Sequence, residues 1–395
     1  MTQGEMLKIL EDFIKKESSA GIILIFVTIL ALILQNSPLS QFYNSFLHTP
    51  VEIRFADLHI AKPLLLWVND GLMAIFFFLI GLEVKREVME GHLSSISQSI
   101  LPVIAAIGGM VVPAIVFLAF NWQDPFAANG WAIPTATDIA FALGILSLLG
   151  NRVPISLKIF LMALAIIDDL GAIVIIALFY TSDLSMLSII VASIALAILF
   201  VMNRIGVTKK AAYIIVGVIL WVSVLKSGVH ATLAGVALAF MIPLYSYKDG
   251  KKFSMLKEME HDLHYWVAFF ILPLFAFVNA GVDLRGLSIE EMLGPVPMGI
   301  MLGLFLGKQL GVFGFSYLAI KFKIAKLPEG SNLKQLYGVA VLTGIGFTMS
   351  LFVDSLAYGD SDIFKYADRL AILLGSFASG LAGYLILKSV KGAKE

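Results

Sequence analysis

The sequence predicts an all-α membrane protein, with twelve transmembrane helices in a single domain over residues 1–395 and a short β-hairpin outside the membrane. Hydrophobic residues make up 59% of the chain and charged residues only 14%, whereas ordinary globular proteins carry roughly 25% charged residues. A helix that spans a bilayer needs about 20 mainly apolar residues. Windows of this kind lie at about 19–35, 63–83, 100–121, 127–149, 155–180, 184–203, 210–225, 228–245, 263–283, 295–320, 335–356 and 364–387. A lipid bilayer is therefore the expected surrounding of this chain.

Charge and cysteine content exclude several classes of function. The 28 Lys and Arg residues balance the 28 Asp and Glu residues, so no surface for a polyanion is indicated and nucleic acid is not an expected partner. The chain contains no cysteine, which excludes disulfides, thiolate metal sites, iron–sulfur clusters and a cysteine nucleophile. No cofactor is expected.

The first window and the basic residues predict the orientation in the membrane. Window 19–35 follows Lys15 and Lys16, but it is too long for the apolar core of a signal peptide and no small-residue cleavage site follows it, so we interpret it as a span. An even number of spans places both termini on one side, and lysine and arginine concentrate on the cytoplasmic side. Outside the spans, few basic residues fall on the side opposite the termini: Arg54, Lys62, Lys226, Arg285, Lys365 and Arg369. Both termini are therefore predicted to be cytoplasmic.

An external β-hairpin is predicted at about residues 48–62, between the first two spans. Residues 51–55 alternate apolar and polar side chains, and the apolar pattern resumes at 58–60 after Ala56-Asp57. A lone two-stranded ribbon is marginally stable in water, so a second copy of the same hairpin is its simplest partner and a homodimer is expected. The alternative is an ordinary loop.

Two groups of three spans have matching interruptions. Spans three to five, at about 100–180, and spans ten to twelve, at about 295–387, each have a middle member that contains helix-unfriendly residues. These are Pro134 in the fourth span and Gly344 and Gly346 in the eleventh. Corresponding members would cross the membrane in opposite directions, so the pattern predicts inverted-topology repeats with two discontinuous helices and a binding site near the midplane. Alternatively, glycine and proline are simply common in membrane helices.

Charged residues within the spans are the strongest functional signal, because each is costly in hydrocarbon. The set comprises Asp70, Asp138, Asp168, Asp169 and Lys308. Asp70 lies nearer the outer surface, where it would line an exit path or be an interfacial acid. Lys308 must pair with a carboxylate, either Asp168 or Asp138, or lose its proton. A structural ion pair and a proton carrier are both consistent with it.

Asp168 and Asp169 lie near the middle of the fifth span. Consecutive helical residues point about 100° apart, so both can border one cavity and should titrate as a coupled pair. Carboxylate oxygens are ligands for hard cations. The hydroxyl of Thr137 can add a neutral ligand, because Thr137 and Asp138 lie where Pro134 should interrupt the fourth span. A bound alkali cation would stabilise the deprotonated pair and protonation would expel the cation, which is the competition that an exchanger needs. The alternative is a pair kept for structure alone.

Four motifs carry a resemblance to a known family: residues 167–171 (Ile-Asp-Asp-Leu-Gly), Thr137-Asp138, Gly307-Lys308 and residues 343–347 (Thr-Gly-Ile-Gly-Phe). With them the chain resembles the NhaA family of bacterial sodium/proton antiporters, from Gly21 to about Gly383. This family is itself a standard example of inverted-topology repeats. The resemblance implies a twelve-span protein of the bacterial inner membrane that exports Na⁺ or Li⁺ in exchange for protons, electrogenically and with activation at alkaline pH.

The resemblance also implies roles for single residues. Asp169 matches the cation-binding carboxylate, Asp168 its neighbour paired with Lys308, and Asp70 an acid near the outward path. Thr137 and Asp138 match the break of the fourth helix and its charge-balancing acid. A cytoplasmic pH-sensing cluster would comprise Glu83, Arg86, Glu87, Lys257, Glu260, His261 and His264. The hairpin resembles the dimer contact of the family.

Other functions are weighed against this interpretation. A cation-coupled symporter of an organic solute would also use a buried carboxylate pair, and composition does not separate either transporter from an ion channel. An intramembrane aspartyl protease needs its two acids on separate helices, whereas Asp168 and Asp169 are neighbours and no G-x-G-D motif occurs. We therefore expect a transporter and not an enzyme.

Overall fold

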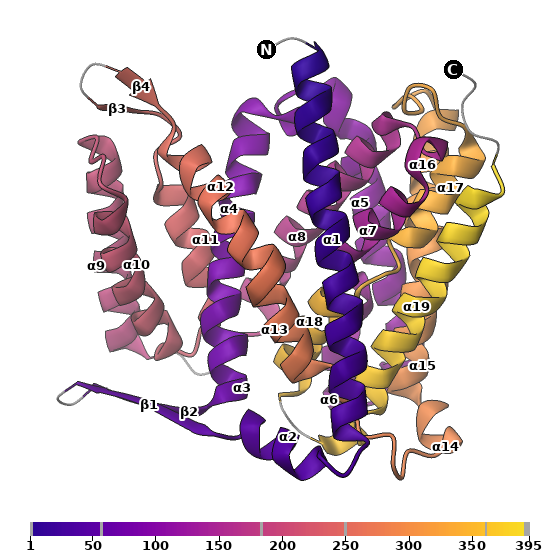
Figure 1. Ribbon diagram of the computed structural model, residues 1–395, viewed down its shortest axis with the longest axis horizontal. Coiled ribbons are helices and arrows are strands. Elements are labelled where there is room, and N and C mark those ends of the chain that lie inside the picture. Colours follow the sequence, from indigo (N-terminus) through magenta and orange to yellow (C-terminus); the bar gives the residue numbers. More distant parts are fainter. Residues whose placement is uncertain (1–2, 56–57, 182–184, 249–250, 360–361, 391–395) are drawn as a thin grey trace. The chain divides into compact units, whose positions relative to one another are not determined.

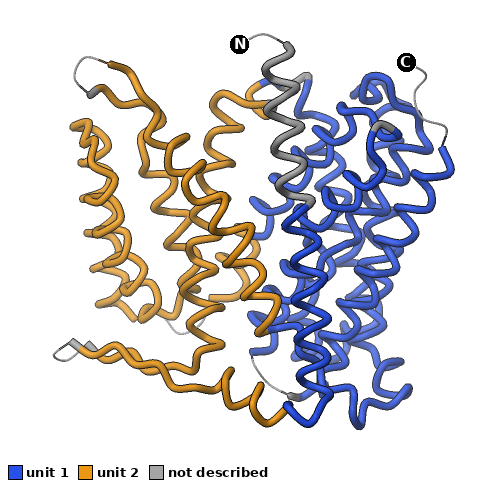
Figure 2. Tube along the Cα trace, viewed as in Figure 1, with its two compact units in different colours: residues 1–39, 95–172, 279–395 blue, residues 40–94, 173–278 orange. Residues whose placement is uncertain are grey.

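The protein consists mainly of helices, which are grouped in two compact units (Figures 1 and 2). The structure, a computed structural model, describes residues 3–55, 58–181, 185–248, 251–359 and 362–390. Unit 1 comprises residues 1–39, 95–172 and 279–395, and unit 2 comprises residues 40–94 and 173–278. Each unit draws on separate stretches of the chain.

The described residues include eight helices that are long and apolar enough to cross a membrane, or ten if each of two bent helix pairs counts as one span. One bent pair is α17 (Leu333–Leu342) with α18 (Phe347–Tyr358), which meet at 43°. Two shorter apolar helices are α10 (Lys210–Leu225) and α11 (Thr232–Met241). The chain is thus a multi-pass helical membrane protein, and the count of twelve stays a prediction.

Unit 1 contains almost all of the two predicted groups of three spans. Its helices are α1 (Gln3–Gln35), α5 (Ile96–Asn121), α6 (Pro125–Ala128), η3 (Asn129–Thr135), α7 (Ile139–Leu148), η4 (Gly150–Arg152), α14 (Ile289–Met292), α15 (Pro295–Leu302), η6 (Gly303–Gly307), η7 (Gln309–Phe313), α16 (Gly314–Lys321), α17, α18, η8 (Asp362–Phe364) and α19 (Ala367–Lys388). Helix α8 (Ile155–Phe179) begins in unit 1. Helix α1 packs against α7, α15 against both α5 and α19, and α17 against α19.

Three glycines spaced four apart bring η6 and η7 into close contact with η3 and α5. The segments η6 and η7 are π-helical and flank Lys308. A Cβ atom at Gly303 would lie 2.7 Å from Cβ of Pro134, and one at Gly307 would lie 2.7 Å from Cα of Pro113. A Cβ atom at Gly311 would collide with the carbonyl oxygen of Gly108. This spacing predicts a close helix-packing face, and the structure confirms it.

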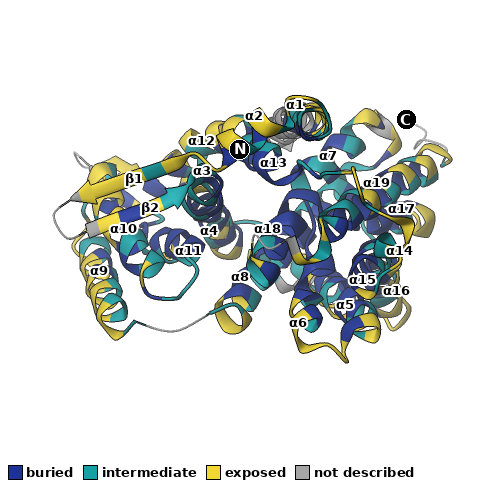
Figure 3. Ribbon diagram, turned by 90° about the horizontal axis from the view of Figure 1, so that it is seen from below, coloured by how far each residue is buried: buried dark blue, intermediate teal, exposed yellow. Residues whose placement is uncertain are grey.

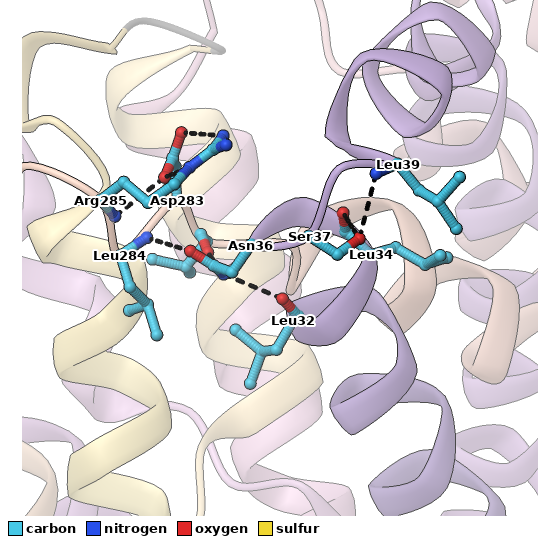
Figure 4. A network of polar contacts seen from close by, with 9 residues as sticks. Leu32, Leu34, Asn36, Ser37, Leu39, Asp283, Leu284 and Arg285 are labelled. Atoms are coloured by element: carbon cyan, nitrogen blue, oxygen red, sulfur yellow. Dashed lines mark hydrogen bonds and ion pairs between the residues drawn. The ribbon is translucent and has the colours of Figure 1, made fainter.

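The end of α1 is held by a polar network (Figure 4). The side-chain amide of Asn36 donates to the carbonyl oxygen of Val282 at 2.8 Å, and its oxygen accepts from the amide of Leu284 at 2.7 Å. Next to them, hydrogen bonds from Arg285 lower the pKa of Asp283 below its ordinary value. The segment 282–285 is thereby fixed to α1 within unit 1.

Unit 2 is built around α4. Its elements are α2 (Ser40–Leu47), β1 (Pro50–Phe55), β2 (Leu58–Pro63), α3 (Leu64–Leu66), η1 (Trp67–Leu72), α4 (Met73–Glu90), η2 (His92–Ser94), α9 (Met186–Arg204), α10, α11, β3 (Ser246–Lys248), β4 (Lys251–Phe253), α12 (Met255–Trp266), η5 (Val267–Ile271) and α13 (Leu272–Asn279). Helix α4 packs against α11 and α12. Only 11% of the apolar window of α9 is buried, against 61% for residues 64–90 (Figure 3).

Two hairpins lie in unit 2, and the sequence predicts only the first. Strands β1 and β2 pair antiparallel with Ile53 opposite Ile60, as the alternation indicates, while the predicted turn at Ala56-Asp57 lies outside the described residues. The indole nitrogen of Trp67 donates to the carbonyl oxygen of Val51 at 3.0 Å, which connects the hairpin to η1. Strands β3 and β4 have three residues each, which is too short for a period-two signal.

The glycine contacts give a stability prediction. We expect Gly311→Ala to lower the free energy of unfolding by about 1–3 kcal/mol, because the added methyl group overpacks the contact with Gly108. Gly314→Ala is the matched control, since no atom lies within 4 Å of its added Cβ position and alanine favours helix. Thermal unfolding in detergent measures both variants. Equal melting temperatures for the two would contradict the proposed close contact.

Candidate functional site

Two short non-helical segments bond to each other inside unit 1. Residues 136–138 separate η3 from α7, and residues 343–346 separate α17 from α18. The amide of Asp138 donates to the carbonyl oxygen of Ile345 at 2.6 Å, so each interruption supplies a partner for the other. Pro134 lies in η3 and has no amide hydrogen to give. At Gly344 any side chain would collide with Ser379 and with the carbonyl oxygen of Leu304, which explains a glycine at this crossing.

Asp138 holds the first turns of two helices at once. One carboxylate oxygen accepts from the amide of Phe141 at 3.0 Å and caps α7. The other accepts from the amide of Thr348 at 3.1 Å and from its hydroxyl at 2.5 Å, at the start of α18. A negative charge is favourable at a helix N-terminus, so this buried carboxylate balances the positive ends of both helices.

Lys308, Asp168 and Thr137 form a buried polar cluster next to this crossing. The ammonium of Lys308 donates to Asp168 Oδ2 at 2.8 Å and to the hydroxyl oxygen of Thr137 at 2.9 Å. The same hydroxyl lies 2.8 Å from Asp168 Oδ2 and 3.0 Å from the carbonyl oxygen of Thr343. The side chain of Lys308 is 0% exposed. Of the two acids considered as its partner, Asp168 is the one that forms the ion pair.

The second oxygen of Asp168 has no hydrogen-bond partner among the described residues, although it is buried. Such an atom costs free energy unless a cation or a proton satisfies it. Asp169 follows on α8, is only 6% exposed, and lies about 100° further round the helix. No group of three or more His, Asp or Glu side chains with metal-site geometry occurs in the described ranges. Carboxylate and hydroxyl oxygens, such as those of Asp168, Asp169 and Thr137, are of the kind that bind hard cations.

Asp70 lies in unit 2, in the π-helical segment η1. Its carboxylate accepts from the ammonium of Lys62 at 2.6 Å, and 23% of its side chain is exposed. The indole nitrogen of Trp221 donates to its backbone carbonyl at 3.1 Å. Asp70 is thus a partly exposed, ion-paired acid. Its pairing with Lys62 was not predicted, because the position of Lys62 at the end of β2 gave no sign that it faces η1.

The predicted pH-sensing residues also lie in unit 2, and Arg86 is the centre of the group. Its guanidinium donates to Glu260 at 2.9 Å and to Glu87 at 2.5 Å. This joins α4 to α12, which are far apart in sequence. The sequence predicted these three residues as one cluster, and the structure brings them together.

The other members of the predicted sensor are less uniform. Lys257 donates to Glu90 at 2.7 Å, and His264 lies 3.9 Å from Glu83. Glu90 was not predicted as a member from the sequence. The side chain of His261 is 84% exposed, and the ion contact it makes is with Asp262, at 3.9 Å. His261 is therefore largely exposed, unlike Glu260 in the Arg86 group.

Comparison with known proteins identifies the family of this chain. The family model described as "Na+/H+ antiporter 1" matches residues 11–387. The chain is 77% identical to the Na(+)/H(+) antiporter NhaA of a Sulfurovum species, over 96% of this chain and 97% of that protein. It is 71% identical to the protein of the same name from a Nitratiruptor species, over 94% and 96%, and 65% identical to that of Campylobacter concisus, over 96% and 92%.

These relatives are transporters, and their names give no support to the symporter, channel or protease alternatives. The match extends over nearly the whole chain, from residue 11 to residue 387. The chain therefore belongs to the NhaA family of Na⁺/H⁺ antiporters.

Proposed function

We propose that the protein exports Na⁺ or Li⁺ in exchange for protons, and that cation and protons compete for Asp168 and Asp169. The observation that carries this proposal is the buried, unsatisfied oxygen of Asp168 beside a second buried carboxylate. Thr137 would add its hydroxyl oxygen as a neutral ligand. Because both acids must be deprotonated to bind a cation, protonation of either one removes a ligand and releases the ion.

Exchange by this competition is electrogenic if both carboxyls release protons when one cation binds, since each cycle then moves a net charge. Lys308 donates to Asp168 in the structure, and it would act either as a structural partner of that carboxylate or as a proton carrier. Transport rates in proteoliposomes should respond to an imposed membrane potential. Rates that ignore the potential would favour neutral exchange.

The remaining features complete the proposal. The chain would cross the bacterial inner membrane twelve times with both termini in the cytoplasm, and its two groups of three spans would be inverted repeats with breaks at Pro134 and at Gly344 and Gly346. Asp70 would line the outward path. Activation at alkaline pH would depend on the Arg86 group, whose partly buried ion pair with Glu260 changes when Glu260 changes protonation. An unchanged pH profile in Glu260→Gln would contradict that role.

The central test replaces the cation ligand. We expect Asp169→Asn to abolish Na⁺/H⁺ exchange and leave folding intact, because an amide keeps the shape but neither binds the cation with a charge nor carries the proton. Fluorescence of a pH-sensitive dye in proteoliposomes measures the exchange. The control is Glu290→Gln, an exposed acid of unit 1 that should keep full activity. Wild-type rates in Asp169→Asn would refute the proposal.

The ion pair gives a stability prediction. We expect Lys308→Ala to lower the free energy of unfolding by about 3–5 kcal/mol, because it leaves the carboxylate of Asp168 buried and unpaired. In the double variant with Asp168→Asn most of this loss should be recovered, since the orphaned charge is gone. Thermal unfolding of the single and double variants makes the comparison. Simple additivity of the two single effects would argue against direct pairing.

We also propose that the β1–β2 hairpin joins two copies of the protein. Two strands alone are marginally stable, their outer edges can pair with another strand, and Ile53 is 51% exposed. We expect Ile53→Asp to convert dimers in detergent to monomers, measured by light scattering after size exclusion. Ile289→Asp, at a more exposed isoleucine of unit 1, should leave the dimer intact. A dimer that survives Ile53→Asp would place its contact elsewhere.

A further inference from the structure

The buried start of α18 presents three successive amides that need partners. The amides of Gly346 and Phe347 both donate to the hydroxyl oxygen of Ser376, at 3.2 and 3.1 Å. The amide of Thr348 donates to Asp138 at 3.1 Å. Ser376 lies on α19 and is only 4% exposed. The first turn of α18 is therefore capped by a side chain from another helix.

This cap is needed because the first amides of a helix have no partner within it. Water normally satisfies them, but these groups are buried, where an unpaired amide is costly. Asp138 already accepts from Phe141 and twice from Thr348. Without Ser376, the amides of Gly346 and Phe347 would lose the hydroxyl to which they donate. The hydroxyl thus adds to the hydrogen bonds by which Asp138 holds the start of α18.

The same turn of α18 is connected to the cation site. The hydroxyl of Ser350 donates to the carbonyl oxygen of Ile133 in η3 at 2.7 Å. Immediately before the turn, the segment 343–346 presents the carbonyl oxygen of Thr343 to the hydroxyl of Thr137. A shift of the first turn of α18 therefore reaches Thr137 through a few covalent bonds and one hydrogen bond.

We propose that Ser376 is a positioning residue for cation binding: its hydroxyl fixes the first turn of α18 and, through it, Thr137, whose hydroxyl contacts Asp168. The proposal rests on the function proposed above, in which these residues bind the cation. The hydrogen bonds of Ser376 described above go to the backbone of α18 and not to Asp168 or Lys308. Its effect is on the geometry of the ligands.

Ser379 provides a matched control on the same helix. It lies three residues further along α19, is 0% exposed, and also faces the interruption, next to Gly344. Its hydroxyl oxygen has no hydrogen-bond partner among the described residues. The two serines thus share chemistry, burial and helix, and differ in whether they cap α18.

The experiment compares Ser376→Ala with Ser379→Ala in proteoliposomes, with Asp169→Asn as the inactive reference. We expect Ser376→Ala to raise the Na⁺ concentration for half-maximal exchange about tenfold, with the maximal rate per folded transporter nearly unchanged. Ser379→Ala should keep the wild-type value. Ser376→Thr, which retains the hydroxyl, should restore most of the apparent affinity. Ser376→Cys keeps the volume with a weaker acceptor and should give an intermediate value.

Two results would overturn the inference. One is a wild-type half-maximal Na⁺ concentration in Ser376→Ala with only a lower melting temperature, which indicates a purely structural cap. The other is an equal loss of affinity in Ser379→Ala. If Ser376→Ala does not fold, Ser376→Cys decides, and wild-type affinity there refutes the role. Failure of the proposed function is distinguished separately, because Asp169→Asn would then remain active.

Discussion

The buried carboxylate of Asp138 accepts hydrogen bonds from the first turns of α7 and α18, and unit 1 is organised around that double contact. Backbone groups exposed by a helix break have no water to bind inside a membrane. The two breaks therefore supply each other, through the bond from the Asp138 amide to Ile345. The amides of Gly346 and Phe347 donate instead to the hydroxyl of Ser376, which lies on α19.

Because the backbone groups at the crossing are hydrogen-bonded, the side chains next to it are held in fixed positions. Thr137 directly precedes Asp138, so the same segment 136–138 places its hydroxyl next to Asp168 and Lys308. Lys308 reaches the cluster because Gly307 and Gly311 let its helix lie close against α5. The wider π-helical turns on both sides of Lys308 are of a kind often found at functional sites.

The sequence predicted the membrane class, the hairpin and the residues of the buried cluster, because charges in apolar spans and period-two alternation are local signals. It left the partner of Lys308 open between Asp138 and Asp168, since that choice depends on how helices 140 residues apart pack. It missed the contacts of Lys62, Glu90 and Ser376, because each depends on packing against another element and leaves no local pattern in the sequence. It grouped His261 with the sensor, and the structure shows that this side chain is 84% exposed. Division into two units was also hidden, because each unit is assembled from separate stretches.

The sparse burial of α9 carries a consequence for variation among relatives. Most of its side chains, such as Ile190, Ile194 and Ile198, make few contacts within the protein, so acyl chains rather than neighbours must solvate them. Such positions require only an apolar side chain, so leucine, valine, phenylalanine or methionine would be equally acceptable. Helix α18 is enclosed along nearly its whole length, and there shape and volume are constrained as well. Sequence drift should therefore accumulate on α9 while α18 stays almost invariant.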